Sequence, residues 1–397
     1  MNFSILKDFM DGLTGWIIPG NSVRVSIGGK EVFSYQSGYE NAEKKIKMRE
    51  DHLYNVFSCS KPITVTAAMQ LWERGLFGLD DPLYEYIPEY RYMNIDDGHG
   101  GVRQAKNAIT IRHLFTMTAG LTYDRETAAF KKARMLTDGK MDTMTVIRCL
   151  AEDPLSCEPG EIWQYSLCHD VLAGVVETVS GKRFSEYVRE NIFEPLGMAE
   201  SYYHNESVID RVAELYRYIS DGETDPVKLQ STARSSEGGR VVNVGKSVPY
   251  VFGSEYDSGG AGITTSVKDY MKFATAMALG GISSDGERII SAETVNLMRQ
   301  NQLNDRQIRG LIWPQLKGYG YGLGVRTMMD TKSAGGGNVG EFGWGGAAGA
   351  TLLVDRDLEL AMFYTHHMLN PQEERSEERR VGKECSIPCR SRWSPYH

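Results

Sequence analysis

The sequence VFSCSKPIT, residues 56–64, joins a strand-like hydrophobic run to a helical pattern. The run before it, residues 53–57, is mostly apolar, and the apolar residues that follow recur on one side of a helix predicted over 58–74. Ser58 therefore lies at a strand-to-helix junction. Because residues three positions apart project from the same face of a helix, we expect Lys61 to lie one turn deeper than the hydroxyl of Ser58.

A serine and a lysine in this arrangement can act as a nucleophile and its base. A serine hydroxyl is a poor nucleophile at neutral pH and needs a neighbour that takes its proton. A partly desolvated lysine can do so, because burial lowers the pKa of an amine. The start of the helix also supplies free backbone N–H groups, and that of Ser58 is suited to a developing oxyanion. Ser58 and Lys61 are therefore the first candidate catalytic residues.

The Ser-x-x-Lys spacing is weakly specific on its own. It also occurs at Ser4–Lys7, where we interpret it as the start of an N-terminal helix over residues 4–16. Only Ser58 follows a strand-like run and has suitable partners downstream. The motif alone, without this context, would be explained equally well by catalysis and by coincidence. Cys59 is an alternative nucleophile, but its side chain is rotated by about 100° from the helical face that carries Ser58 and Lys61.

Composition excludes several classes of protein. The chain has 397 residues, 41% hydrophobic and 24% charged, which is enough for a large core and two lobes. No apolar run approaches the ~20 residues of a membrane span, and residues 1–20 lack the pattern of a signal peptide, so a cytoplasmic location is expected. A net charge of −8 with mixed signs argues against nucleic-acid binding.

The cysteines predict free thiols. No CxxC pair and no zinc-type spacing with histidine occurs among the six, which are Cys59, Cys149, Cys157, Cys168, Cys385 and Cys389. A disulfide framework is therefore less expected than reduced side chains. Serine-based hydrolysis needs neither a metal nor a cofactor, and we predict none.

Hydrophobic periodicity divides the chain into regions. Strands alternate around Gly28-Gly29, a predicted hairpin turn, and again from residue 319 to 364, where they predict an antiparallel sheet. Helices and long loops dominate residues 79–198. We therefore predict one domain over residues 1–372, composed of an α/β lobe (1–57 and 258–372), a helical lobe (58–204) and a glycine-rich excursion (205–257) over the surface.

The last residues differ from the rest of the chain. Residues 373–397 are charged and have no apolar periodicity, so we expect disorder from about residue 375. They resemble stray sequence at the end of a translated fragment. We therefore interpret them as a candidate non-native tail in place of a final helix that would cover the sheet.

Two further stretches supply partners for Ser58. WQYSL, residues 163–167, precedes a predicted helix and places Tyr165 on a loop, where a tyrosine next to a lysine can act as base for the serine and acid for the leaving group. The alternative is an ordinary core tyrosine. FGWGGA, residues 342–347, has glycines that let a strand approach a ligand closely, and the N–H of Ala347 is a candidate second oxyanion donor. The alternative interpretation of residues 342–347 is a glycine-rich bulge or turn without a catalytic role.

The order of these three motifs resembles that in the serine β-lactamase and penicillin-binding-protein superfamily. More narrowly, the chain is similar to the class C β-lactamase-related esterases, often called family VIII carboxylesterases. The resemblance covers residues 4 to about 370, including IRHLFTMTAGL at 111–121, EPLGM at 194–198 and GGAG at 259–262. It implies a β-lactamase-like α/β (α+β) fold, in which helices flank an antiparallel sheet and the active site lies between this sheet and a mostly helical lobe.

Departures from the superfamily pattern point to the esterase-like branch. Leu167 stands where the second motif usually ends in asparagine, and Trp344 replaces the usual lysine or histidine of the third. No cation at position 344 would then meet the carboxylate of a β-lactam. Leu167 and Trp344, together with Gly345 and Gly346, are instead expected to bind an acyl or alcohol group through apolar surface.

Two polar residues near Tyr165 have simpler interpretations than catalysis. His169, four positions later, could be taken for a triad histidine, but a supporting or helix-start role is the more common one. Asp170 is interpreted as a helix N-cap.

The resulting hypothesis is a serine hydrolase that cleaves small-molecule carboxylic esters through an acyl-serine intermediate. Alternatives at the same site are β-lactamase, amide-hydrolase or acyl-transferase activity on an ester or amide. An alternative of another class is a non-catalytic binder of acyl compounds or peptidoglycan fragments, or a scaffold. The presence of Ser58, Lys61 and Tyr165 together argues against this last alternative, because a binder has no reason to keep all three. The oligomeric state is open.

Overall fold

The computed structural model describes residues 2–14, 18–220, 239–246, 248 and 251–369. The predicted tail and part of the predicted excursion lie outside the described residues.

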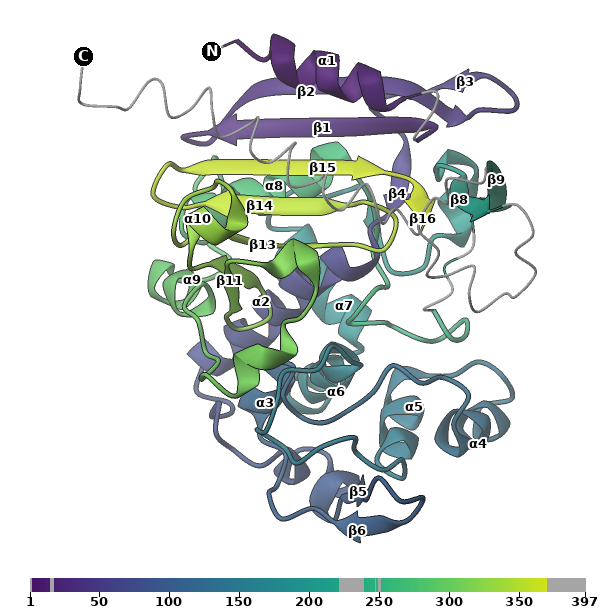
Figure 1. The fold of residues 1–397 in the computed structure, drawn as a ribbon, viewed down its shortest axis with the longest axis vertical. Coiled ribbons are helices and arrows are strands. Elements are labelled where there is room, and N and C mark those ends of the chain that lie inside the picture. Colours follow the sequence, from purple (N-terminus) through teal and green to yellow (C-terminus); the bar gives the residue numbers. More distant parts are fainter. Residues whose placement is uncertain (1, 15–17, 221–238, 247, 249–250, 370–397) are drawn as a thin grey trace.

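An eight-stranded antiparallel sheet forms one layer of the molecule (Figure 1), as predicted. Across the sheet the strands are β11 (Tyr319–Tyr321), β12 (Arg326–Met328), β13 (Phe342–Gly345), β14 (Thr351–Asp355), β15 (Leu360–His366), β1 (Gly20–Ile27), β2 (Lys30–Asn41) and β3 (Ile46–Lys47). The order places β1 next to β15, so the first and last strands of the sheet in the sequence pair with each other. This pairing brings the two ends of the chain into one layer.

The predicted hairpin between β1 and β2 is confirmed. Its two turn residues, Gly28 and Gly29, have φ angles of 57° and 75°, which glycine adopts without steric strain.

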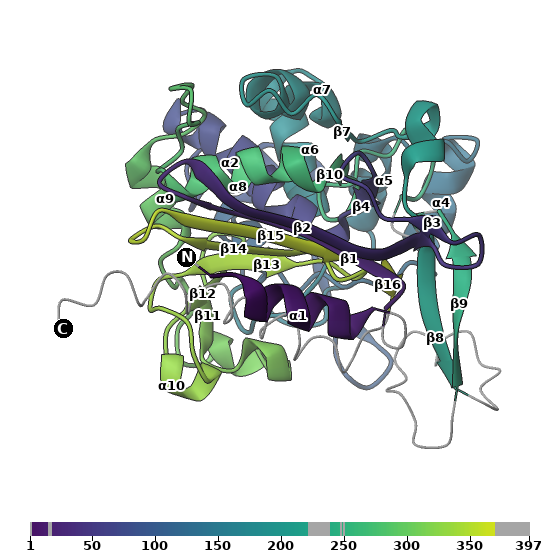
Figure 2. The ribbon, with the colours of Figure 1, turned by 90° about the horizontal axis from the view of Figure 1, so that it is seen from above.

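Helices cover both faces of the sheet (Figure 2). Helix α1 (Ser4–Leu13) buries Leu6 and Met10 on one face, where they pack with Val23 and Tyr364. On the opposite face α8 (Val267–Ala278) packs against β15, and α9 (Ala292–Met298) follows it in the chain. A four-residue helix, α10 (Thr331–Ala334), lies between β12 and β13 in sequence.

The remaining helices lie beyond one side of the sheet (Figure 1). They are α2 (Ser60–Glu73), α3 (Ile111–Phe115), α4 (Ala128–Leu136), α5 (Thr143–Leu150), α6 (Cys168–Ser180) and α7 (Phe184–Val188), which continues as a π-helical turn (Arg189–Phe193). Single 3-10 turns occur at Leu83–Glu85, Pro88–Arg91, Glu206–Arg211, Gln307–Gly310 and Pro314–Leu316. The boundaries of the predicted lobes stay a prediction.

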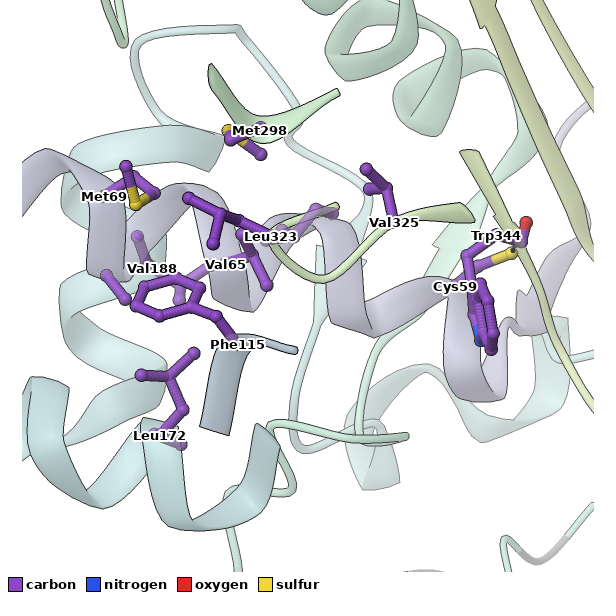
Figure 3. Packing of buried hydrophobic residues seen from close by; sticks show 14 of the residues in the cluster. Cys59, Val65, Met69, Phe115, Leu172, Val188, Met298, Leu323, Val325 and Trp344 are labelled. Carbon is purple, nitrogen blue, oxygen red and sulfur yellow. Dashed lines mark hydrogen bonds between the residues drawn. The ribbon is translucent and has the colours of Figure 1, made fainter. Parts of the chain in front are cut away.

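Helix α2 is the centre of the core. Every residue from Ser60 to Leu71 is buried, whereas the sequence predicted one apolar side only. A helix buried on all sides is expected where it packs between other elements, and α2 packs against α6 and also contacts β13. Figure 3 shows Val65 of this helix together with Leu323 and Phe115 from its two sides. This packing fixes the helix that carries the candidate lysine.

Three smaller ladders complete the fold. β10 (Thr264–Ser266) lies between β4 (Leu53–Asn55) and β7 (Ser201–Tyr202). β5 (Asn94–Asp96) and β6 (Val102–Gln104) form a short hairpin that the sequence did not predict. Its turn is held by the carboxylate of Asp97, which accepts hydrogen bonds from the N–H groups of His99 and Gly101.

The predicted excursion, residues 205–257, contains regular structure. β8 (Leu215–Ser220) pairs with β9 (Gly239–Gly245) and with β16 (Met368–Leu369). No clear alternation of apolar and polar residues marks β8, because it buries neighbouring residues on both faces, including Leu215 and Tyr216. Val248, from the same segment, packs against the small cluster that includes Phe57 and Ala348.

No helix in the described part of the chain is long and apolar enough to cross a membrane. Cys59, Cys149, Cys157 and Cys168 are free thiols, as predicted; the other two cysteines lie outside the described residues.

Candidate active site

The junction before α2 holds Ser58 in an unusual backbone turn. Phe57, fully buried, has a φ angle of +47°, a left-handed conformation that costs energy for a residue other than glycine. Ser58 follows in a single 3-10 turn (Phe57–Cys59) that leads into α2. The turn leaves Ser58 partly exposed and buries Cys59, whose thiol donates to the carbonyl oxygen of Trp344 at 3.4 Å. Cys59 therefore faces the sheet, as Figure 3 also shows, and is not presented as a nucleophile.

Ser58, Lys61 and Tyr165 converge. The hydroxyl oxygen of Ser58 lies 3.1 Å from Nζ of Lys61 and 2.6 Å from the hydroxyl oxygen of Tyr165. Nζ of Lys61 also lies 4.7 Å from the centre of the Tyr165 ring. The phenol thus contacts the serine directly, while the lysine lies over the face of its ring. Two proton-transfer groups therefore flank one serine hydroxyl.

Lys61 is fully buried and has three oxygen partners. Besides Ser58, its ammonium donates to the carbonyl of Gly260 at 2.8 Å and to the hydroxyl of Tyr123 at 3.0 Å. Buried charges persist when every N–H finds an acceptor, and an ammonium has three donors to satisfy. Sequence reasoning missed Tyr123 because it follows α3 in an irregular segment with no periodicity and no motif of its own.

Replacing Tyr123 with phenylalanine removes one of these acceptors. We expect kcat for a p-nitrophenyl ester to fall by about tenfold, because a hydrogen bond to a charged group is worth about 1.5–3 kcal/mol and only part of it acts on the reaction. Steady-state kinetics measure this. Tyr86→Phe is the matched control, since the Tyr86 hydroxyl bonds to Asp81 away from the site. Equal activity of Tyr123→Phe and the native protein would show that Tyr123 does not position Lys61.

Asp170 does not cap α6, contrary to the sequence-based interpretation. The helix begins at Cys168, so Asp170 lies inside its first turn and is buried. Its carboxylate accepts hydrogen bonds from the hydroxyl groups of Tyr256 at 3.0 Å and Ser258 at 2.7 Å, and burial raises its pKa. Asp170 thus anchors the segment that presents the Gly260 carbonyl to Lys61.

His169 has no direct contact with Ser58 in the structure. It is fully buried, its Nε2 lies 3.4 Å from the carbonyl oxygen of Phe115, and burial followed by the nearby charge of Lys61 lowers its pKa to about 3. A neutral, enclosed imidazole fits the supporting role that the sequence suggested.

Ser58 and Ala347, whose backbone N–H groups are the two predicted oxyanion donors, line the same pocket. In the described part of the chain, neither the backbone N–H of Ser58 nor that of Ala347 donates a hydrogen bond to protein. The strand end that carries Ala347 reaches the serine junction because Gly346 lacks a side chain: a Cβ there would lie 2.3 Å from the carbonyl oxygen of Val56. Two free donors beside a nucleophile are suited to a developing oxyanion.

A pocket of about 350 Å³ opens at Ser58. Its described lining residues are Ser58, Tyr123, Arg125, Tyr165, Ala261, Trp313, Gln315, Leu316, Arg326, Trp344, Gly345, Gly346 and Ala347. Gln315, Leu316 and the two arginines were not anticipated from the sequence, because they come from loops and strands distant from the motifs. Nearly half of these residues are aromatic or glycine.

Leu167 does not line this pocket, contrary to its predicted substrate-binding role. Its side chain is 3% exposed and packs with residues of α4 and α5, including Phe130 and Val146. The reason is its place immediately before α6, from which it points toward the two neighbouring helices rather than toward Ser58.

Trp344, in contrast, is part of the pocket wall as predicted. Its ring stacks on that of Tyr165 with centroids 5.6 Å apart, and its indole N–H lies 3.4 Å from the Tyr165 hydroxyl oxygen. Trp313 packs against Tyr165 in an edge-to-face arrangement, with ring centroids 4.9 Å apart. These contacts hold the phenol in place beside Ser58.

Comparisons with known proteins find similarity to an esterase, an acyltransferase and a hydrolase of known structure. Esterase EstB of Burkholderia gladioli is 32% identical over 346 residues, which cover 84% of this chain and 82% of EstB. Acyltransferase calJ of Penicillium decumbens is 27% identical over 364 residues, covering 86% of this chain and 82% of its own. The structure of EstCE1, a hydrolase with promiscuous acyltransferase activity, superposes with a TM-score of 0.74 and 24% identity over 95% of this chain and 98% of that one.

A family model described as Beta-lactamase matches residues 7–384, nearly the whole chain. The match includes all three motifs that meet at the pocket, together with the antiparallel sheet and the helices around it. The chain therefore belongs to the β-lactamase family.

Proposed function

We propose that this protein is a serine hydrolase that cleaves carboxylic esters of small molecules through an acyl-serine intermediate. The observation that carries the proposal is the position of the Ser58 hydroxyl at a pocket wall, 3.1 Å from Nζ of Lys61 and 2.6 Å from the hydroxyl oxygen of Tyr165. A hydroxyl becomes a nucleophile when a group within hydrogen-bonding reach can take its proton.

In the first half of the reaction, Ser58 attacks the ester carbonyl. Its proton passes to whichever of Lys61 and Tyr165 is in its basic form, and the new C–O bond places negative charge on the carbonyl oxygen. The N–H groups of Ser58 and Ala347 stabilise this charge. When the tetrahedral intermediate collapses, the bond to the alcohol breaks and the alcohol oxygen takes up the proton, leaving an acyl group on Ser58.

In the second half, water replaces the alcohol. Tyr165 and Lys61 accept a proton from the attacking water, the same oxyanion donors act again, and the proton returns to Ser58 as the acid leaves. Every proton removed in one step is returned in a later one, so the residues named here complete the cycle. Lys61 also stabilises negative charge that develops on Tyr165, because its cation lies over the ring.

Esters are favoured over β-lactams by the residue at position 344. Trp344 fills the place where a cation would meet the lactam carboxylate and stacks on Tyr165 instead. Similarity to EstB supports the same substrate class. Acyl transfer to an alcohol is the second candidate, because the aromatic wall formed by Trp313 and Trp344 can hold an organic acceptor in place of water and because calJ is an acyltransferase. Small-molecule substrates and a cytoplasmic location stay predictions from the sequence.

Covalent labelling tests the nucleophile. A fluorophosphonate probe reacts with an activated serine, and peptide mapping after labelling should locate the adduct on Ser58. Cys59→Ala should be labelled as the native protein is, because the Cys59 thiol points away from the pocket. Labelling at another residue, or no labelling of folded protein, would favour a non-catalytic binder.

A comparison of substrates separates the enzyme activities. We expect p-nitrophenyl butyrate to be hydrolysed with a kcat/KM about a hundredfold or more above that for nitrocefin, because no cation at position 344 is available to the lactam carboxylate. Colorimetric assays measure both under the same conditions. If nitrocefin is the better substrate, the interpretation of Trp344 is wrong and β-lactamase activity replaces esterase activity in the proposal.

A further inference from the structure

Asp257 is a fully buried carboxylate that the proposed mechanism does not use. Its Oδ1 accepts hydrogen bonds from Nε2 of His204 at 2.7 Å and from the guanidinium of Arg183 at 3.3 Å. Its Oδ2 accepts from the backbone N–H of Ser185 at 2.9 Å. Burial alone would raise the pKa of Asp257, but these bonds hold it below its usual value. A charge at this depth is therefore compensated by three donors.

The bonds of Asp257 join three separate elements. His204 follows β7, whereas Arg183 and Ser185 belong to the start of α7. The backbone N–H of Asp257 donates to the hydroxyl of Thr143, the first residue of α5, at 2.7 Å. Asp257 thus fixes the end of a chain segment against the helical part of the molecule.

The segment that begins at Asp257 leads directly to Lys61. Three residues further on, the carbonyl of Gly260 accepts the hydrogen bond from Nζ of Lys61 at 2.8 Å, and the next residue, Ala261, lines the pocket. The packing around this carbonyl is tight, because even a Cβ at Gly260 would lie 2.5 Å from a carboxylate oxygen of Asp170. A shift at Asp257 would therefore be transmitted to the acceptor of the lysine.

The two buried aspartates hold this segment in different ways. Asp170 accepts hydrogen bonds from the hydroxyl groups of Tyr256 and Ser258, which attach the segment to α6. Asp257 lies between these two residues in the chain and attaches the segment to α5 and α7 instead. Without Asp257, the side-chain bonds of residues 256–258 would reach only one helix.

We propose that Asp257 and His204 are positioning residues for catalysis, because their hydrogen-bonded pair fixes residues 258–260 so that the Gly260 carbonyl meets Lys61. Neither residue is among the described residues that line the pocket, so both act through the lysine. The inference rests on the proposed ester hydrolysis and adds two residues outside the pocket on which its rate depends.

Asp257→Asn keeps the size of the side chain but removes its charge. We expect kcat for p-nitrophenyl butyrate to fall by about tenfold with little change in KM, because the acceptor of Lys61 moves while the pocket stays intact. The limb of the pH–kcat profile that reports the ionisation of Lys61 should move to lower pH by about half a unit, because a displaced carbonyl stabilises the ammonium less. A general loosening of the fold would instead lower kcat equally at every pH.

Variants of His204 carry the same test if Asp257→Asn does not fold. His204→Leu removes the donor from a partly exposed position and should reproduce the loss in kcat and the shift of the limb. His204→Gln keeps a donor and should retain about half of the native kcat or more. A native kcat and pH profile in folded His204→Leu and Asp257→Asn would overturn the proposal.

Asp269 supplies the matched control. It is also a buried aspartate, bonded to the partly exposed cation of Lys272 at 2.8 Å, but it lies on α8, outside the segment that reaches Lys61. Asp269→Asn should therefore leave kcat and its pH profile unchanged, whatever its effect on Tm. The same kinetic defect in Asp269→Asn as in Asp257→Asn would contradict a specific positioning role.

The charge of His204 is tested by stability. Its hydrogen bond to Asp257 raises the pKa of His204 against the lowering effect of burial; the charge of Glu206 also raises it, and that of Arg183 lowers it. Such a histidine stabilises the fold fully below its unfolded pKa, about 6.5, and loses this contribution as pH rises through the folded pKa. The Tm difference between the native protein and His204→Gln should therefore be larger at about pH 6 than at about pH 9. A difference independent of pH would contradict the pairing of His204 with Asp257.

Hydrogen exchange tests the positioning without any substrate. The N–H groups of Ala261 and Gly262 donate to the hydroxyl and the carbonyl oxygen of Ser258, both at 3.0 Å. Mass spectrometry of a peptide covering residues 256–263 should show exchange about tenfold or more faster in Asp257→Asn than in the native protein or in Asp269→Asn. Faster exchange in a protein that hydrolyses no ester would contradict the proposed function alone. Native exchange rates in Asp257→Asn would contradict the positioning role and leave ester hydrolysis intact.

Discussion

Replacing Ser58 with alanine is expected to lower kcat for p-nitrophenyl butyrate by a factor of about 10⁵ or more. The substitution removes the only atom that can form the acyl-enzyme, and loss of a catalytic nucleophile in serine hydrolases costs about this much. The neighbouring hydroxyl of Ser60 cannot replace it, because it is fully buried and accepts a hydrogen bond from the N–H of Ile263 at 3.0 Å. Active-site titration and steady-state kinetics on the purified variant measure the effect.

The double variant Ser58→Ala/Lys61→Met makes this test sharper. Lys61 acts through Ser58. The double variant should therefore lower kcat by about the same factor as Ser58→Ala alone, rather than by the product of the two single-variant factors. Lys61→Met by itself should lower kcat by about 10³ or more, since methionine keeps the length of the buried side chain but cannot exchange a proton. Retention of more than a hundredth of native activity by Ser58→Ala would exclude the proposed acyl-serine.

Tyr165→Phe is expected to have the next largest effect, a loss of about 10²–10⁴ in kcat, the usual contribution of a general acid–base residue. The ring should keep its place because Trp344 stacks on it and Trp313 packs edge-to-face against it. The hydroxyl, which lies 2.6 Å from the Ser58 oxygen, is the only group removed. The variant should therefore bind ester with little change in KM.

The pH dependence of Tyr165→Phe separates proton transfer from packing. If Tyr165 exchanges protons with Ser58, the variant should lose one limb of the pH–kcat profile, whereas a packing defect would lower kcat equally at every pH. Tyr86→Phe, which removes a partly buried hydrogen bond of a phenol hydroxyl, serves as the control. A Tyr165→Phe variant with more than a third of native kcat would assign proton transfer to Lys61 alone.

Local sequence patterns were sufficient to predict elements whose residues interact with near neighbours. The two glycines at Gly28-Gly29 predicted a hairpin turn because few other residues tolerate its backbone conformation. Apolar periodicity over 58–74 predicted α2, which lies at Ser60–Glu73. Prediction failed where burial on both sides removes periodicity, as in β8, and where an aspartate near a helix start, Asp170, lies inside the helix rather than at its cap.

The predicted site residues fall into two groups for a similar reason. Ser58 and Lys61 are one helical turn apart, so their contact follows from local geometry. Side-chain chemistry made Tyr165 a candidate partner, but only the resemblance to a family distinguished it from an ordinary core tyrosine, since 107 residues separate it from Ser58. Leu167 was assigned to the pocket by its closeness in sequence to Tyr165, but the two side chains diverge where the loop enters α6.

The amino-acid sequence by itself was sufficient to predict the candidate nucleophile, the lysine beside it and the glycine-rich strand opposite them, because each prediction depends on residues adjacent in the chain. Only the tertiary structure decided that Tyr123 and the Gly260 carbonyl hold Lys61, and that Arg326 reaches the pocket. The physical reason is that these groups meet through strand pairing and helix packing between distant segments. Contacts of that kind leave no periodic signal in the sequence.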